Sequence, residues 1–246
     1  MSVDANPAHG GRPQPSRAAS APVIVALDAL SEADSIALAR VLAGTVWGSK
    51  VNDLLLQSGV AVLPRLAAYG RVFCDVKLFD IPNTVANQVA RLAGAGADLI
   101  TLHCAGGAAM LAAARAARDR INPQTRLLGV TVLTSFDDAA AQASFGRPVV
   151  EQVRAFATLA LEAGLDGVVC APAELALLDA VDPQHRLQRV TPGVRPDWHG
   201  AADDQVRTHT PAAARAAGAD LLVIGRPITQ AADPAAACAR ILAELA

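Results

Sequence analysis

The stretch RVFCDVKLFDIPNT, residues 71–84, contains both halves of a β/α unit and decides the fold. Residues 71–77 are largely apolar up to a charged end, as expected of a strand in a parallel sheet with both faces covered. Pro82 suits the start of a helix, and it restricts Ile81 to an extended conformation. The stretch therefore predicts a buried strand that ends in charged residues and leads into a helix.

The same alternation continues on both sides of this stretch. The predicted strands are 23–27, 45–50, 71–77, 98–102, 127–131, 167–170, 189–191 and 221–224. Ser31 is the expected N-cap of the first helix. The later helices are predicted at 54–68, 84–95, 107–118, 149–163, 173–181, 212–217 and 234–245. One helix-to-strand turn is reused before an Asp, at Gly96-Ala97-Asp98, Gly164-Leu165-Asp166 and Gly218-Ala219-Asp220.

Eight alternations without a domain break predict a single α/β domain, a closed (β/α)8 TIM barrel, over residues 21–246. The alternative is an open doubly wound sheet, but its Gly-x-Gly-x-x-Gly turn is missing after the first strand, where Leu27-Asp28-Ala29 stands. Two longer connections, 135–148 and 195–210, are expected at the end of the barrel that closes over a substrate. Residues 1–20 are rich in Ala, Pro, Gly and Ser, which predicts a disordered tail rather than a secretory signal.

The composition excludes several classes of partner. The chain has 246 residues, of which 52% are hydrophobic, and a formal net charge of -2. It has no basic excess for nucleic acid and no polybasic run for an anionic membrane, and no apolar run reaches the roughly 18 residues of a membrane span. The four cysteines lack metal-site spacing, which indicates buried thiols in a reducing compartment and a cytoplasmic location.

Polar residues stand at the carboxyl ends of the predicted strands, where barrel enzymes build active sites. Asp28, Lys50, Asp75 and Lys77 come from the first three strands, and Asp75 and Lys77 are two residues apart, so they project to one side. These alternating charges predict a fixed network that aims a cationic lysine into the barrel mouth. The alternative is an ion-pair cluster that only closes the barrel. Later strand ends carry His103, Thr134, Ser135, Arg195 and Arg226.

Two neighbouring turns predict a phosphate site. Gly225-Arg226 follows the last strand and Gly193-Val194-Arg195 follows the seventh. Glycine allows the backbone to approach an anion, and a guanidinium binds phosphate through two hydrogen bonds. Loops after the seventh and eighth strands commonly hold phosphate in barrels of this kind.

Asp80 is expected to point away from its own barrel mouth, because it follows the strand and precedes the extended Ile81 and Pro82. The site of a neighbouring subunit is then one destination for its carboxylate. The alternative is a residue near a helix N-terminus that the helix dipole favours.

The run DVKLFDIPNT, residues 75–84, resembles the signature of the orotidine 5′-phosphate decarboxylase family. Further matches follow in family order: VALD at 25–28, VTVLTS at 130–135, TPGVR at 191–195 and VIGRPI at 223–228. Asp-x-Lys-x-x-Asp alone is shared with other sugar-phosphate decarboxylases, and the Ile-Pro-Asn-Thr extension makes the match more specific.

The resemblance implies that the chain converts orotidine 5′-monophosphate to UMP, the last step of de novo pyrimidine nucleotide synthesis, without a cofactor or metal. Lys77 would donate a proton to C6 of the pyrimidine, with Asp75 and Lys50 beside it. Asp80 would enter the site of the partner in a homodimer. The substrate-binding residues would be Asp28, Thr84, Thr134, Arg195, Gln205, Gly225 and Arg226. One departure is Lys50-Val51-Asn52, where the family commonly has Lys-Val-Gly.

Two other functions stay open. One is a Mg2+-dependent decarboxylase or aldolase of another sugar phosphate, which would use the same Asp-x-Lys-x-x-Asp core. The other is a catalytically silent nucleotide-binding barrel. The complete set of charges argues against the silent barrel, because binding alone does not need a buried lysine between carboxylates.

Overall fold

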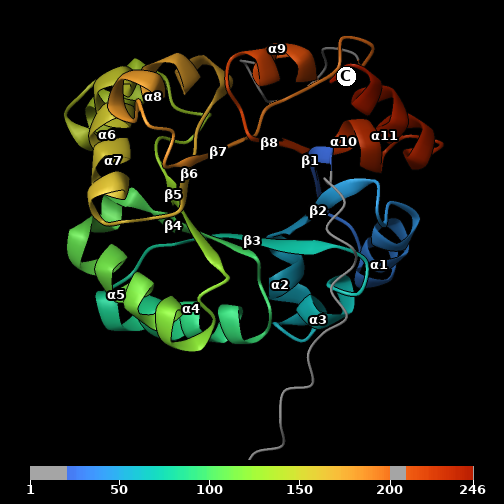
Figure 1. Ribbon diagram of the computed structural model, residues 1–246, viewed down its shortest axis with the longest axis horizontal. Helices are drawn as coiled ribbons and strands as arrows, with labels where there is room; N and C mark the ends of the chain where they lie inside the picture. The colour runs from blue at the N-terminus through green and yellow to red at the C-terminus, as the bar shows by residue number, and fades with distance from the viewer. Residues whose placement is uncertain (1–20, 200–208, 246) are drawn as a thin grey trace, which may run out of the picture.

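The computed structural model describes residues 21–199 and 209–245, and in it eight parallel strands close into one barrel in chain order (Figure 1). The strands are β1 (Ala21–Ala26), β2 (Val46–Val51), β3 (Arg71–Leu78), β4 (Leu99–His103), β5 (Arg126–Val130), β6 (Gly167–Val169), β7 (Gln188–Thr191) and β8 (Leu221–Ile224). Because β1 pairs with both β2 and β8, the predicted TIM barrel is confirmed and the open sheet is wrong. The predicted tail, residues 1–20, lies outside the described residues.

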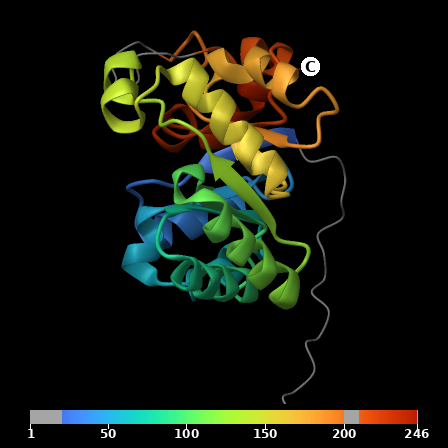
Figure 2. The same ribbon diagram turned by 90° about the vertical axis from the view of Figure 1, so that its left-hand side faces the viewer.

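Helices form the outer layer of the barrel (Figures 1 and 2). They are α1 (Glu32–Val41), α2 (Asp53–Ser58), α3 (Val62–Leu66), α4 (Pro82–Gly94), α5 (Gly107–Ile121), α6 (Asp138–Phe145), α7 (Val149–Glu162), α8 (Leu175–Val181), α9 (Pro211–Ala216), α10 (Arg226–Thr229) and α11 (Pro234–Ala243), with 3-10 turns η1 (Cys104–Gly106) and η2 (Pro172–Glu174). Ser31 caps α1 as predicted, since its hydroxyl accepts from the backbone N–H of Asp34. Pro82 and Pro234 begin α4 and α11, also as predicted.

Three segments differ from the prediction. The predicted helix at 54–68 is two short helices, because Gly59 takes a left-handed conformation (φ 63°) that ends α2. The connection at 135–148, predicted as a loop, contains α6. Asp137 caps this helix through the N–H of Ala140, and Gly146 ends it in the left-handed conformation. A short helix, α10, also follows β8 directly.

Two apolar cores hold the barrel together. The larger one lies between the strands and the helices and includes Val25, Val85 and Met110. The smaller one fills the barrel interior with Ile24, Ala26, Trp47, Phe73, Leu99, Leu128, Val190, Leu221 and Val223. Ile24 pairs with Val223 in register, so interior side chains of neighbouring strands lie at one level. The charged residues of the first three strands follow these interior residues toward the carboxyl ends.

The reused helix-to-strand turn that the sequence predicts lies at the amino ends of the strands. In each copy the Asp carboxylate accepts a hydrogen bond from a backbone N–H at the start of the preceding strand. The pairs are Asp98 with Val72 (2.8 Å), Asp166 with Leu127 (2.7 Å) and Asp220 with Arg189 (2.7 Å). These carboxylates satisfy donors at the amino ends, which makes that face a structural one and leaves the carboxyl ends for a site.

Candidate active site

A cavity of about 560 Å³ opens at the carboxyl ends of the strands. Most of the predicted site residues line it, namely Asp28, Lys50, Asp75, Lys77, Thr134, Arg195, Gly225 and Arg226. Asp80 and Thr84 are absent from the described residues that line the cavity, and Gln205 lies outside the described residues. The structure therefore brings residues from both halves of the barrel to one place, as predicted, but leaves Asp80 and Thr84 outside.

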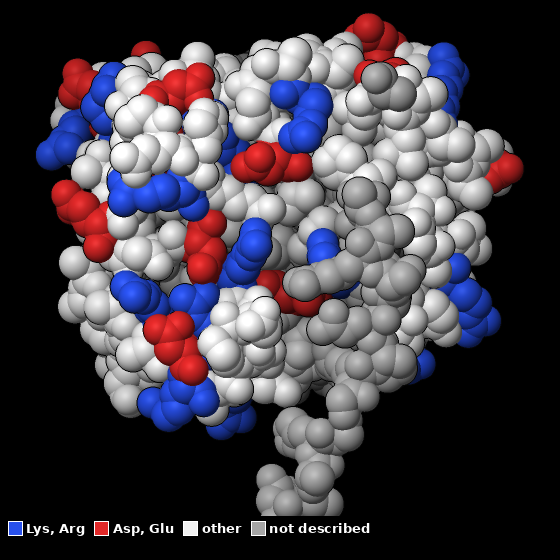
Figure 3. Space-filling view, viewed as in Figure 1, with Lys and Arg blue, Asp and Glu red and all other residues white. Residues whose placement is uncertain are grey.

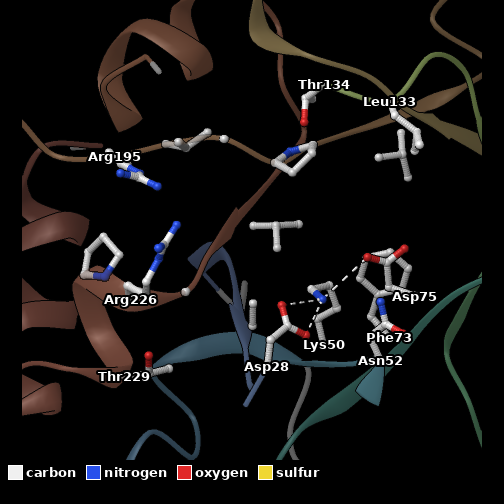
Figure 4. Close-up of a pocket in the computed structure, with 18 of the residues that line it drawn as sticks. Asp28, Lys50, Asn52, Phe73, Asp75, Leu133, Thr134, Arg195, Arg226 and Thr229 are labelled. Atoms are coloured by element: carbon white, nitrogen blue, oxygen red, sulfur yellow. Dashed lines mark hydrogen bonds and ion pairs between the residues drawn. The ribbon is translucent and has the colours of Figure 1, made fainter. Parts of the chain in front are cut away.

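The four charged residues Asp28, Lys50, Asp75 and Lys77 form a continuous row of ion pairs, which we call the charged network. Figure 4 shows the part of it that joins Lys50 to Asp28 and Asp75. The Lys50 Nζ atom lies 2.8 and 2.9 Å from the two Asp28 carboxylate oxygens and 3.5 Å from Asp75 Oδ2. The Lys77 Nζ atom lies 2.9 Å from Asp75 Oδ1. Each lysine thus contacts a carboxylate, and Asp75 bridges the two ammonium groups.

The two lysines differ in exposure. The side chain of Lys50 is 7% exposed and is held between two carboxylates, whereas that of Lys77 is 33% exposed and, among the described residues, forms an ion pair with Asp75 only. A buried charge is stable only when it is paired, so Lys50 is fixed in place. Lys77 is the lysine whose ammonium group is available to a molecule in the cavity.

Strand register explains why Lys50 points into the barrel. Lys50 pairs with Ala26 of β1 on one side and with Phe73 of β3 on the other. Both of these neighbours belong to the interior core, and paired residues on adjacent strands share a face. Asp75 is two residues beyond Phe73, so it projects into the barrel as well.

Lys77 reaches the cavity through an irregular piece of backbone. The register of β3 against β4 shifts between Cys74 and Leu78, and Lys77 has a left-handed conformation with φ 47°. Such a conformation costs a residue with a side chain about 1–3 kcal/mol, so its surroundings must stabilise it. Period-two alternation predicted that Asp75 and Lys77 would meet, but it did not predict this bulge.

Thr101 of β4 supports the bulge, and sequence reasoning missed it. Its fully buried hydroxyl accepts a hydrogen bond from the Lys77 backbone N–H (2.8 Å) and donates one to Asp75 Oδ1 (3.1 Å). One side chain therefore holds both the backbone of Lys77 and the carboxylate that pairs with its ammonium group. The only sequence signal is a hydroxyl residue within the apolar run LITLH.

His103 has a structural role. Its Nδ1 atom accepts from the backbone N–H of Ala105 (3.2 Å) at the start of η1, and its ring lies 5.8 Å from that of Phe79. Burial lowers the pKa of His103 below its ordinary value, and the positive charge of Lys77 lowers that pKa further. A neutral ring suits a histidine whose Nδ1 must accept a hydrogen bond.

Two arginines define the other side of the cavity. Figure 4 shows the side chains of Arg195 and Arg226 facing each other, across the cavity from Lys50 and Asp75. Arg195 follows Gly193, whose left-handed φ of 76° makes the turn after β7, and Arg226 begins α10 directly after β8. A cavity with two guanidinium groups at one side and an ammonium group at the other suits an anion with separated charges.

Asn52 also lines the cavity, at the start of α2. Asparagine stands here where the family commonly has glycine, and Lys50 keeps its place in register with Ala26 and Phe73. Further polar lining residues that the sequence did not single out are Thr229 and Gln230, at and after the end of α10. Their position directly after the Gly225-Arg226 turn was the available signal.

Asp80 and Thr84 lie at the beginning of α4, outside the cavity. The exposed Asp80 carboxylate accepts from the backbone N–H of Ile81 (2.6 Å). The flanking side chains of Phe79 and Ile81 are 64% and 66% exposed, which makes an apolar surface around an acid. The prediction that Asp80 points away from its own barrel mouth agrees with this position.

The remaining predictions concern cysteines, metals and surfaces. All four cysteines are buried free thiols, as predicted, and burial raises the pKa of Cys74, Cys104 and Cys170 to about 12. Within residues 21–199 and 209–245, His, Cys, Asp and Glu form no group of three suited to a metal ion. None of the described helices has the length and apolarity needed to cross a bilayer. In Figure 3 basic and acidic side chains are interspersed on the visible face.

Known proteins resemble this chain along most of its length. The model of the orotidine 5′-phosphate decarboxylase / HUMPS family matches residues 21–241. A protein from Paramagnetospirillum magneticum named orotidine 5′-phosphate decarboxylase is 48% identical over 236 residues, which cover 91% of this chain and 98% of that protein. A protein of the same name from Thermobifida fusca is 48% identical over 232 residues and covers 92% and 96%.

A solved structure agrees with these relatives. The crystal structure of orotidine 5′-phosphate decarboxylase from Lactobacillus acidophilus has a TM-score of 0.78 and is 34% identical, over 92% of this chain and 99% of that one. Fold, motifs and near full-length similarity point the same way. The chain belongs to the orotidine 5′-phosphate decarboxylase / HUMPS family.

Proposed function

We propose that this protein decarboxylates orotidine 5′-monophosphate to UMP, the last step of de novo pyrimidine nucleotide synthesis, with Lys77 as the proton donor. The observation that carries the proposal is the charged network, in which Asp75 holds the Lys77 ammonium group toward a cavity with two arginines at its other side. The family membership and the shared name of the relatives support the same substrate.

The charges account for the chemistry. The bond between C6 and the carboxyl carbon breaks, CO2 leaves, and the electron pair remains on C6. The ammonium group of Lys77 stabilises that developing negative charge and then transfers a proton to C6. Asp75 aims Lys77, and the buried Lys50 holds Asp75 and Asp28 in place, so no rearrangement of the protein is needed when the charge forms.

The opposite side of the cavity binds the phosphate in this proposal. Arg195 and Arg226 pair with the phosphate oxygens, Gly225 allows close approach, and Gln205 contributes from outside the described residues. Asp28 contacts the ribose and Thr134 the pyrimidine. Because the phosphate is remote from C6, its binding energy can be used to hold the reacting carbon against Lys77.

A homodimer with shared sites completes the proposal. Asp80 and Thr84 lie outside the cavity of their own chain, and the exposed Phe79 and Ile81 flank Asp80. Large exposed apolar side chains around an acid favour a surface that a second copy covers. Asp80 and Thr84 then act in the partner's cavity, with Asp80 beside the partner's Lys77. The location is cytoplasmic, where the pathway's other small-molecule steps occur.

Turnover in the presence of EDTA tests the reaction. We expect the purified protein to convert orotidine 5′-monophosphate to UMP at an undiminished rate with EDTA, and Lys77→Ala to abolish the conversion while the protein still folds and binds UMP. Loss of turnover with EDTA would favour the Mg2+-dependent sugar-phosphate reaction. UMP binding without any turnover by the wild-type protein would favour the silent barrel.

Mixed dimers test the shared site. Lys77→Ala and Asp80→Ala should each be inactive alone. In a dimer with one subunit of each kind, one site has both defects and the other has neither. A random mixture of the two variants should therefore regain about one quarter of the wild-type activity. If mixing restores no activity, Asp80 does not serve the partner's site.

A further inference from the structure

The segment that follows Arg195 is tied to the last helix of the chain. The indole Nε1–H of Trp198 donates a hydrogen bond to Glu244 Oε1 at 2.9 Å. The guanidinium carbon of Arg240 lies 4.5 Å from the centroid of the Trp198 ring, within the range of a cation–π contact. Both partners come from the C-terminal end of α11, more than forty residues away in the chain, and we call the three residues the indole clamp.

The indole clamp is packed as well as hydrogen-bonded. Trp198 is half-buried and packs against the larger apolar core, as do Leu242 and Leu245 from the same end of the chain. An indole held on one edge by a carboxylate and on one face by a guanidinium has little freedom to move. The position of Trp198 is therefore set by α11.

Arg195 is held on its other side by the strand-like contact after β7. Its backbone N–H donates to the carbonyl of His209 at 2.9 Å, and Val194 forms a parallel bridge with His209. Between Arg195 and Trp198 the chain is short and stiff, because Pro196 is buried and its carbonyl accepts from the N–H of His199 at 3.1 Å. The backbone of Arg195 thus lies between two anchors, His209 and the indole clamp.

A phosphate-binding arginine needs such anchoring. A guanidinium binds phosphate through two parallel hydrogen bonds only when two of its N–H groups face the phosphate oxygens together, and a working site holds such groups to within about 0.5 Å. The glycine before Arg195 and the long connection after it would by themselves allow the backbone at Arg195 to shift, and the guanidinium group would shift with it. The contacts of Trp198 oppose that freedom from a helix that does not itself line the cavity.

We propose that Trp198, held by Arg240 and Glu244, is a positioning residue for Arg195, so that the C-terminal helix α11 takes part in binding the 5′-phosphate of the substrate. This inference rests on the proposed function only for the identity of the phosphorylated ligand. It assigns the indole clamp a role in affinity for the phosphate, not in proton transfer at C6.

Binding of UMP and of uridine separates this role from a merely structural one, because the two ligands differ only in the phosphate. We expect Trp198→Ala to weaken UMP binding about tenfold, as a displaced guanidinium would, and to leave uridine binding unchanged. Trp198→Phe retains a ring for Arg240 but loses the N–H, so its effect on UMP should be intermediate. Glu244→Gln retains an acceptor for the indole and should stay near wild type, whereas Glu244→Ala should resemble Trp198→Phe.

A matched control exists where the last turn of α1 meets the segment before β3. Tyr69 accepts a hydrogen bond from Arg40 Nε (3.2 Å), and Arg40 lies over its ring (5.5 Å), but neither residue lines the cavity. Tyr69→Ala should therefore cost stability without changing the ratio of UMP to uridine affinity.

The outcomes are distinct. Equal weakening of UMP and uridine by Trp198→Ala, or a Tyr69→Ala variant with the same loss of UMP affinity, would overturn the inference. If Trp198→Ala fails to fold, the order of Glu244→Gln, Glu244→Ala and Trp198→Phe in UMP affinity decides instead, and no difference among them refutes the role. A wild-type protein that binds UMP without turning over substrate would refute the proposed function and leave this test intact.

Discussion

Replacing Thr101 by valine tests how the reactive lysine is held. Valine has nearly the shape of threonine, so the change leaves no cavity and removes only the hydroxyl. That hydroxyl makes two hydrogen bonds, one accepted from the Lys77 backbone N–H at 2.8 Å and one donated to Asp75 Oδ1 at 3.1 Å. After the change, the Lys77 N–H has lost its partner in a partly buried place, beside the fully buried side chain of residue 101, and Asp75 has lost a donor.

The expected loss of stability follows from those two contacts. A hydrogen bond to a charged group contributes about 1.5–3 kcal/mol net, and a buried N–H left without a partner costs about 1–3 kcal/mol. We therefore expect the free energy of unfolding to fall by about 3 kcal/mol. The left-handed backbone of Lys77 (φ 47°) loses its support as well, so the ammonium group should move relative to C6 of the substrate.

The expected loss of activity is larger than the loss of binding. A displacement of about 1 Å at a reacting group costs about 100-fold in rate, which corresponds to about 2.7 kcal/mol of activation free energy. The phosphate side of the cavity is untouched, so UMP affinity should change little. Urea unfolding measures stability, single-turnover decarboxylation measures the chemical step, and calorimetric titration measures UMP binding.

Thr125→Val is the matched control. The Thr125 hydroxyl is also buried and donates to the carbonyl of Ala97 at 2.7 Å, but it lies just before β5, at the amino end of the barrel. This variant should lose about 1–2 kcal/mol of stability and none of the rate. If Thr101→Val keeps the single-turnover rate of the control, Thr101 does not position Lys77, and the reasoning is wrong.

Three further predictions follow from the same structure. Arg226→Ala should raise KM for orotidine 5′-monophosphate and lower kcat/KM by at least about tenfold, because one guanidinium is lost from the phosphate side; unchanged steady-state constants would contradict that assignment. Burial lowers the pKa of His103 in the folded chain below the 6.5 of an unperturbed histidine. Between the lowered pKa and 6.5, the unfolded chain binds a proton that the folded chain does not, so the free energy of unfolding should fall as the pH drops through this range. His103→Asn, which keeps an acceptor for the Ala105 N–H, should flatten that slope in urea titrations from pH 7 to pH 5, and an unchanged slope would exclude His103 as its source. The buried thiols of Cys74, Cys104 and Cys170, with pKa values of about 12, should resist alkylation at pH 8 until the protein is unfolded. Mass spectrometry measures the modification, and rapid alkylation of the native protein would show the burial to be wrong.

The sequence by itself determined the barrel and the identity of the charged network. Apolar runs of strand length alternate with helical segments eight times, and helical crossovers make successive strands parallel, which brings every carboxyl end to one face. The sequence alone therefore places the four residues of the charged network together, because their neighbours in sequence set both strand position and side-chain direction. The two arginine turns were predictable for the same reason.

Only the tertiary structure decided how these groups are held. The register shift that gives Lys77 its left-handed backbone depends on how β3 pairs with β4, and Thr101 supports it from a different strand. The exclusion of Thr84 from the cavity depends on the direction the chain takes into α4. The contact of Trp198 with Glu244 joins segments 46 residues apart. Local sequence sets propensity and alternation over a few residues, whereas these contacts exist because barrel closure brings distant segments together, and no local pattern encodes which of them meet.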